Sequence, residues 1–342
     1  MSTIILTGVT GQDGSHMADY LLKNTKHKIY GGVRRLSVPN HKNIEHINSD
    51  RFELINLDLN DTHSIEENIF HLKPDYFINF AAQSFVGASW DYPRQTFETN
   101  ATAVLDILEA IRKHAPKCRF YNAGTSEEFG DVQYEPQDEK HPLRPRSPYG
   151  ASKAAARHIV KVYRESYKLF AIQGWLFNHE GVRRGEEFVT RKITRSAAKI
   201  KLDMVAEASP KPIELGNLSA KRDWSSAEDF VDGIWRMINT KKPKDYVLAS
   251  GETHTIRNFV EEAFKTLDIE GSWTGKGRGE KYIDEPSKKV LVQVNPKFYR
   301  PAEVSLLLGD SALARKELAW EPKTSFKQLV QKMTHHDLYD QA

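Results

Sequence analysis

The chain has 342 residues, and its 49 Lys and Arg nearly balance its 46 Asp and Glu, leaving a formal net charge of +3. Hydrophobic residues make up 39% and aromatic residues 10%, which excludes a disordered chain. The small charge excess argues against a general nucleic-acid coat. This length predicts two domains, or one large α/β unit with an appended lobe.

Cys118 is the only cysteine, so the sequence contains no internal disulfide pair. The apolar run at the N-terminus is short and leads into glycines, unlike a signal peptide. No stretch approaches the roughly 18 apolar residues of a membrane span. We expect a cytoplasmic protein without a membrane, nucleic-acid or metal partner.

Short apolar runs alternate with helical patterns through the first half of the chain. Six runs predict buried strands, at residues 3–8, 28–35, 52–59, 75–82, 119–126 and 170–177. Because these runs are apolar on both faces, we expect a doubly wound parallel sheet of the Rossmann type, an α/β fold with helices on both faces.

The pattern changes after about residue 177. Residues 183–200 predict a loop that leads into a basic amphipathic helix, and 226–239 and 255–267 predict two more helices. Residues 208–217 predict a proline-marked connection and 272–289 a Gly/Lys-rich loop. We predict a nucleotide-binding domain over residues 1–177, to which segments around 217–250 return, and a smaller substrate-binding lobe over residues 178–342.

A glycine-rich turn directly follows the first predicted strand and opens a helix. Glycines here permit a tight turn and let the backbone approach a pyrophosphate at the helix N-terminus. This position favours a dinucleotide site over a merely structural turn. The expected contact residues are Gly8, Thr10, Gly11, Gln12, Asp13 and Gly14.

The ends of the next strands complete the expected cofactor site. Arg34 and Arg35 stand where an NAD-preferring site carries an acidic residue. Guanidinium groups suit a 2′-phosphate, so NADP is favoured, the alternative being two solvated surface arginines. Further contacts are expected at Asp58, Leu59, Ala81, Ala82 and Ser84.

Tyr149 and Lys153 lie four residues apart in a helix predicted to begin near Ser147 and Pro148. A free tyrosine has a pKa of about 10, and a nearby ammonium lowers it by stabilising the phenolate. About one such spacing is expected by accident in this chain, but only Tyr149 has it. The pair indicates a catalytic site only because it follows the predicted nucleotide-binding segment at the right distance in the sequence.

Thr125, Ser126 and Glu127 end the fifth predicted strand, where a doubly wound sheet binds its ligand. A hydroxyl there can bond a substrate oxygen near Tyr149, and a carboxylate offers a second acid or base. The alternative is that these residues only cap a turn. The sequence leaves open whether Glu127 or Glu128 points inward.

Together these motifs resemble the extended short-chain dehydrogenase/reductases. Longer stretches narrow the resemblance to the GDP-mannose 4,6-dehydratase family and cover essentially the whole chain. These stretches are GVTGQDGS, NFAAQS, SPYGASK, YRESY, LFNHEGVRRGEEFVTRKITR, LGNLSAKRDW and KFYRPAEVSLLLGD.

The resemblance implies a role for each matching residue. Thr125, Glu127 and Tyr149 fall on catalytic positions with Lys153 in support, and His179 and Arg184 on positions that contact NADP. The positions that hold the GDP-sugar are Ser84, Asn178, Lys192, Asn217, Arg222, Arg300 and Glu303. For the basic run 183–195, the alternative is a solvated helix face or an RNA-binding patch. The resemblance also implies a homodimer or homotetramer.

Three departures from the expected family pattern concern the sugar. Phe85 replaces an expected His, Glu128 and Phe129 replace an expected Leu-Tyr, and Gly124 replaces an expected Ser. We expect these residues to lie beside the sugar pocket, so that the substrate is GDP-mannose or the bulkier GDP-D-glycero-D-manno-heptose.

The implied reaction is an internal redox cycle that yields a 4-keto-6-deoxy GDP-sugar. Tyr149 takes the C4 hydroxyl proton, Thr125 holds that oxygen, and Glu127 moves the C5 proton and assists loss of water from C6, while NADP carries the hydride from C4 to C6. Two alternatives are an NADP-dependent epimerase or reductase, which does not need Glu127, and a non-catalytic nucleotide sensor.

Overall fold

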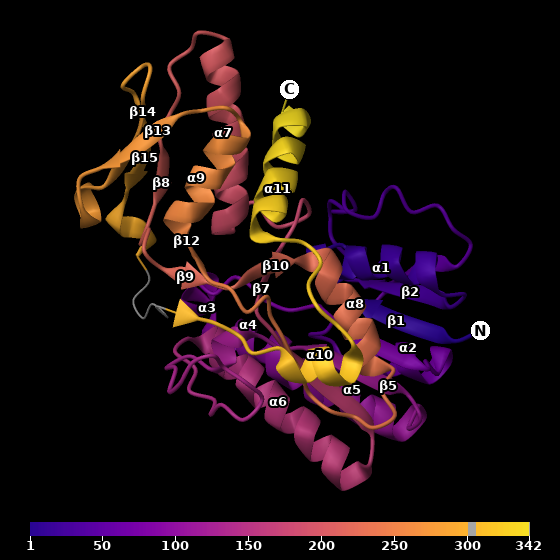
Figure 1. Cartoon of the computed structure of the whole chain (residues 1–342). Helices are drawn as coiled ribbons and strands as arrows, with labels where there is room; N and C mark the ends of the chain where they lie inside the picture. The colour runs from indigo at the N-terminus through magenta and orange to yellow at the C-terminus, as the bar shows by residue number, and fades with distance from the viewer. Residues whose placement is uncertain (300–305, 342) are drawn as a thin grey trace.

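A seven-stranded parallel sheet lies at the centre of the computed structural model, which describes residues 1–299 and 306–341 (Figure 1). The strand order is β11-β6-β5-β4-β1-β2-β3, and each neighbouring pair is parallel. The strands are β1 (Thr3–Thr7), β2 (Lys28–Val33), β3 (Phe52–Asn56), β4 (Tyr76–Asn79), β5 (Arg119–Ala123), β6 (Phe170–Leu176) and β11 (Val247–Leu248). The predicted α/β fold and its six strands are confirmed, and β11 is an addition.

Helices cover both faces of this sheet because successive residues of a strand point in opposite directions. Ile4 and Leu6 of β1 pack in one apolar cluster, whereas Ile5 packs in another on the opposite face. The first face is covered by α1 (Gln12–Asn24), α8 (Ala227–Ile238) and α10 (Ala312–Leu318). The second is covered by α2 (Thr62–Leu72), α5 (Ala103–His114) and α6 (Pro148–Tyr167), and the short α3 (Ala88–Asp91) and α4 (Pro93–Phe97) precede α5.

A second core lies in the C-terminal part of the chain (Figure 1). Its helices are α7 (Val189–Val205), α9 (Ile256–Thr266) and α11 (Phe326–Gln341). They accompany a four-stranded sheet of order β13-β14-β15-β8, formed by β13 (Gly271–Thr274), β14 (Lys281–Asp284), β15 (Val290–Val294) and β8 (Ile213–Leu215). The three helices expected after residue 177 are confirmed as α7, α8 and α9, although α8 packs in the first core, and α11 is an addition.

The predicted loops at 208–217 and 272–289 were therefore wrong in part. The first contains β8, and the second folds into the antiparallel hairpin of β13 and β14. Trp273 and Tyr282 face each other across this hairpin and pack against the second core. Gly275 and Gly277 supply the positive φ angles of the turn, at 77° and 55°. The many lysines and glycines hid two strands that each bury an aromatic ring.

Short strands connect the two cores. β7 (Asn178–Glu180), directly after β6, pairs in parallel with β10 (Trp224–Ser226). β9 (Lys221–Arg222) lies between β12 (His254–Thr255) and β16 (Leu306–Leu307). Within the described ranges, every helix is too short or too polar to cross a membrane.

Candidate active site

The glycine-rich turn after β1 is built so that only small residues fit. Gly8 has φ +66°, and a Cβ there would lie 2.7 Å from the amide nitrogen of Ala81. A Cβ on Gly14 would lie 2.2 Å from the Gly8 carbonyl oxygen. Helix α1 begins at Gln12, and its N-cap Gly11 offers no side chain, so the first-turn N–H groups face outward toward a ligand. A helix N-terminus of this kind favours an anion, and these residues fit the pyrophosphate of a dinucleotide.

The other predicted cofactor residues follow the ends of neighbouring strands. Arg34 and Arg35 are exposed just beyond β2, and Leu59 is buried beyond β3. Parallel strands bring their carboxyl ends to one edge, which is the ligand-binding edge of such sheets. The structure therefore gathers this group on one edge: Thr10, Arg34, Arg35, Asp58, Leu59, Ala81, Ala82 and Ser84. Their contacts with a cofactor stay a prediction.

His179 of β7 reaches the first turn of α1. Its Nε2 lies 2.9 Å from Asp13 Oδ2, and its main-chain oxygen accepts a hydrogen bond of 3.0 Å from Gln12 Nε2. Burial lowers the pKa of His179, but the Asp13 carboxylate outweighs burial and raises it above its usual value. Burial raises the pKa of Asp13, but His179 and Arg184 outweigh burial and lower it. The geometry thus supports an imidazolium–carboxylate pair that ties β7 to the glycine turn.

Tyr149 and Lys153 lie one turn apart in α6 and are both buried. Ser147 begins this helix as predicted, since its hydroxyl accepts a 3.0 Å hydrogen bond from the Gly150 amide. Lys153 Nζ donates a 2.8 Å hydrogen bond to the Ala123 carbonyl at the end of β5. The helix therefore sets the phenol and the ammonium against the ligand-binding edge.

Burial controls the protonation of both groups. It lowers the pKa of Lys153 to about 8, with Glu128 and Asp13 opposing this effect. Burial also raises the pKa of Tyr149, although a hydrogen bond with Thr125 lowers it again in part. In the protein alone Tyr149 is thus a phenol, and a cation brought close to the ring would favour the phenolate.

Thr125 connects the turn after β5 to Tyr149. Its Oγ1 accepts a 3.2 Å hydrogen bond from the Glu127 amide and also bonds Tyr149, so it both caps a turn and contacts the predicted base. Glu127 is half-buried, and its charge raises the pKa of Tyr149, which shows that the two groups interact. Glu128 is fully buried against Arg157 and cannot reach a substrate. Of the two carboxylates, Glu127 is the one at the site.

Two predicted sugar-nucleotide residues lie where the chain returns from the second core to the first. Asn178 of β7 pairs with Trp224 of β10, and Arg222 lies two residues earlier on β9. Arg222 is 7% exposed, and Asn178 Oδ1 is buried with no hydrogen-bond partner among the described residues. The Asn178 oxygen is therefore a polar atom that a ligand can satisfy.

The other predicted sugar-nucleotide residues lie in the C-terminal part. Lys192 of α7 places Nζ 3.6 Å from the centroid of the Phe298 ring, and burial lowers its pKa. Asn217 follows β8 and accepts a 3.0 Å hydrogen bond from the Ser219 amide. Arg300 and Glu303 lie outside the described residues.

Comparison with known proteins decides the family. The model of the family described as GDP-mannose 4,6 dehydratase matches residues 5–333. The chain belongs to the GDP-mannose 4,6-dehydratase family. A relative of that name from Drosophila melanogaster is 45% identical, over 98% of this chain and 85% of the relative. A Vibrio cholerae relative of that name is 41% identical, over 98% of this chain and 93% of the relative.

Solved structures support the fold of this family member. The dTDP-glucose 4,6-dehydratase from Bacillus anthracis in complex with NAD matches with a TM-score of 0.80 and 20% identity. The match covers 100% of this chain and 97% of that one. At this identity the likeness shows the fold alone.

The three departures from the GDP-mannose 4,6-dehydratase pattern have different surroundings. Phe85 is 37% exposed and lies edge-on to Phe188, with 5.9 Å between ring centroids. The Arg184 guanidinium lies 3.7 Å from the centroid of that second ring. Glu128, in contrast, is buried in an ion pair with Arg157, and a side chain on Gly124 would meet that pair, so neither position offers a side chain to a ligand.

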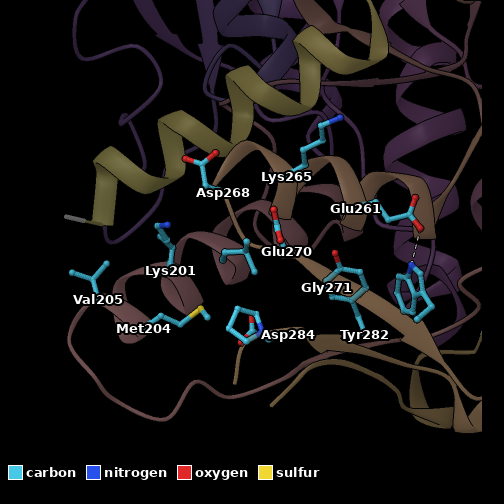
Figure 2. A pocket seen from close by; sticks show the side chains of 13 residues that line it. Lys201, Met204, Val205, Glu261, Lys265, Asp268, Glu270, Gly271, Tyr282 and Asp284 are labelled. Carbon is cyan, nitrogen blue, oxygen red and sulfur yellow. Dashed lines mark hydrogen bonds between the residues drawn. The ribbon is translucent and has the colours of Figure 1, made fainter. Parts of the chain in front are cut away.

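A cavity of about 820 Å³ lies elsewhere in the molecule, between the end of α7, α9 and the hairpin of β13 and β14 (Figure 2). Its wall includes Trp273, whose Nε1 donates a 2.7 Å hydrogen bond to Glu261. No predicted site residue belongs to its lining. The predicted catalytic and cofactor residues therefore lie away from this cavity.

Proposed function

We propose that this protein is an NADP-dependent GDP-sugar 4,6-dehydratase. Its substrate is GDP-mannose or GDP-D-glycero-D-manno-heptose, and its product is the 4-keto-6-deoxy GDP-sugar. The observation that carries the proposal is the buried contact of Tyr149 with Thr125, beside Lys153 and Glu127 at the ligand edge of the sheet. The relatives named GDP-mannose 4,6 dehydratase, at 41% and 45% identity, support the same reaction.

NADP is proposed over NAD because of the residues beyond β2. Arg34 and Arg35 are both exposed there, and two guanidinium groups suit a 2′-phosphate. When bound, NADP would supply the acceptor that takes a hydride from C4 of the sugar and returns it to C6. The turn at Gly8–Gly14 would hold its pyrophosphate.

The side chains of the site manage the protons. Tyr149, as a phenolate stabilised by Lys153, takes the proton of the C4 hydroxyl while Thr125 holds that oxygen. The C4 ketone makes the C5 proton acidic, and Glu127 removes it. Glu127 then donates this proton to the C6 hydroxyl, which leaves as water and leaves a C5–C6 double bond. When the hydride returns to C6, C5 takes the proton held by Tyr149, which restores the phenolate. A half-buried carboxylate next to the phenol suits both steps.

We also propose that the two parts of the chain bind different ligands. Residues 1–177, with the returning segments around 217–250, would bind NADP, and residues 178–342 would mainly hold the GDP-sugar. This division is supported by β11 joining the central sheet and by α8 packing in the same cluster as α1. Lys192 and Asn217 belong to the C-terminal part.

We also propose a homodimer or homotetramer. The helices α3, α4, α5 and α6 carry exposed apolar side chains on the outside of the sheet, which a partner subunit would cover. These are Trp90 at 45% exposure, Phe97 at 47%, Leu105 at 36% and Val162 at 54%. Light scattering of the purified protein tests this, and a monomeric mass would refute it.

The function itself is tested by mass spectrometry of the products from each GDP-sugar, offered separately without added reductant. A dehydratase yields a product lighter by one water and consumes no net NADPH. A product of unchanged mass with inverted stereochemistry would instead support the epimerase alternative. Absence of any product from either sugar would refute the proposal.

A further inference from the structure

A line of buried polar side chains crosses the central sheet near the carboxyl ends of its strands. Thr7, Asn79, Asn122 and Gln173 stand opposite one another in register on β1, β4, β5 and β6. Each is at most 2% exposed. Thr7 donates to Asn79, which donates to Asn122 at 2.7 Å, which donates to Gln173 at 2.7 Å. These bonds offset the penalty of burying four polar groups in the sheet.

This polar line ends on a carboxylate. Gln173 Nε2 donates a 3.0 Å hydrogen bond to Glu128 Oε1 and another of 3.0 Å to the Lys153 carbonyl. Every donor along the line points toward Glu128, which is 0% exposed. A carboxylate only accepts hydrogen bonds, so it fixes the direction of the whole line.

A buried guanidinium completes the surroundings of Glu128. Arg157, 5% exposed, donates from Nε to Glu128 Oε2, and its NH1 donates a 2.7 Å hydrogen bond to the Gln173 carbonyl. The guanidinium carbon lies 3.4 Å from the centroid of a Trp175 ring. A Cβ on Gly124 would lie 2.7 Å from both Arg157 NH2 and Glu128 Oε1. Two departures from the family pattern, Gly124 and Glu128, therefore belong to one packed unit.

Glu128 also reaches the catalytic turn through the main chain. Its Oε1 accepts a 2.9 Å hydrogen bond from the Thr125 amide, while the Thr125 hydroxyl caps the same turn. This reciprocal arrangement is a capping box, which fixes the backbone of its first residue. Thr125 is held at φ −153° and ψ 151°, the conformation in which its hydroxyl bonds Tyr149.

We propose that Glu128 is a positioning residue for the reaction: its carboxylate holds the Thr125 main chain so that the Thr125 hydroxyl meets Tyr149 and the sugar C4 oxygen. Arg157 compensates the buried charge mainly at Oε2, whereas the Thr125 amide and Gln173 Nε2 hold Oε1. This role rests on the proposed dehydratase function, since it assigns Thr125 a catalytic contact.

Two single variants and their combination separate positioning from stability. Glu128→Leu leaves Arg157 buried without its carboxylate, and Arg157→Met leaves Glu128 buried without its guanidinium, so each should lower the melting temperature. The double variant removes both charges and should recover part of that loss, since the Thr125 amide and Gln173 Nε2 still lack the acceptor that Glu128 provided. We expect kcat to fall about tenfold or more in Glu128→Leu and in the double variant, with KM for the GDP-sugar within about threefold. Arg157→Met should keep kcat within about threefold, because the Thr125 amide retains its acceptor.

The control is Glu109→Gln, which changes another carboxylate that accepts a hydrogen bond from α6, through Tyr163. It lies on α5, on the outer side of the sheet, and should leave kcat unchanged. Amide hydrogen exchange of the Thr125 segment, measured without substrate or cofactor, should be faster in Glu128→Leu and in the double variant only.

Recovery of both stability and kcat in the double variant would show a purely structural role and overturn the proposal. Unchanged exchange at Thr125 in Glu128→Leu would overturn it as well. A wild-type protein that yields no dehydrated product refutes the proposed function instead, and the exchange measurement then still decides whether Glu128 holds Thr125.

Discussion

Replacing Lys153 by Met should make the protein more stable and inactive at the same time. Lys153 is 3% exposed, and burial lowers its pKa from 10.5 to about 8. That difference corresponds to about 3 kcal/mol of free energy by which burial disfavours the charged form. Below pH 8 the folded protein carries this cost in full, because both folded and unfolded states hold the proton. A methionine has no charge to bury. At pH 7 the free energy of unfolding of the variant should therefore exceed that of the wild type by up to about 3 kcal/mol.

The pH dependence gives the prediction its sign. Between pH 8 and 10.5 the unfolded chain holds the Lys153 proton and the folded protein has released it, so wild-type stability rises with pH relative to the variant. The advantage of Lys153→Met should therefore shrink across this window and vanish above it. Equilibrium denaturation of both proteins at pH 7, 8, 9 and 10 measures the difference, and kcat should fall at least about a hundredfold.

The control is Lys161→Met on the same helix, whose side chain is 57% exposed. It should change neither stability nor turnover by much, since its charge is solvated. A Lys153→Met protein less stable than wild type at pH 7, or an advantage independent of pH, would refute the reasoning that burial sets the energetics of this ammonium.

Three further predictions concern the proposed function. Glu127→Gln should lower kcat about a hundredfold or more while calorimetry shows nearly unchanged GDP-sugar affinity, and unaltered turnover would remove Glu127 from the mechanism. Replacing Arg34 and Arg35 together by Ala should weaken NADP binding about tenfold or more and leave NAD binding nearly unchanged, so an equal loss for both would count against a 2′-phosphate site. Phe85→His should shift the ratio of kcat/KM between the two GDP-sugars by about threefold or more toward GDP-mannose, and an unchanged ratio would show that Phe85 does not select the sugar.

Much of the fold could be predicted because its strands are long apolar runs. The six predicted strands are four to seven residues long, and helices separate all of them except β2 and β3. β11 has two residues, Val247 and Leu248, and becomes a strand only because it pairs with β6. The hairpin of β13 and β14 was hidden by charged and glycine residues, and its two buried rings mean little until the second core is in place. A local apolar pattern therefore predicts the strands of the central sheet that have one, but not the strands that form only through pairing with distant segments.

Some residues of the candidate site could likewise be located from local sequence patterns, and others could not. Tyr149, Lys153 and the glycine turn could be located because each lies at a strand-to-helix junction or in a helix with its own start signal. The partnership of Asp13 with His179 spans 166 residues, and it was not predicted from the sequence. Glu128 was left open, although Thr125 and Glu128 have the spacing of a capping box, a signal that indicates which carboxylate turns inward.

The surroundings of Tyr149 explain why its phenol should lose the proton only when a ligand is bound. Burial raises its pKa, and both Glu127 and Glu128 raise it further. The Thr125 hydrogen bond and the charge of Arg184 lower that pKa, but burial outweighs both. Burial also weakens the hold of Lys153 on its own proton. The protein by itself therefore stores Tyr149 in the protonated form. Only a ligand that adds positive charge beside the ring can make the phenolate, so proton removal from the sugar is confined to the fully assembled site.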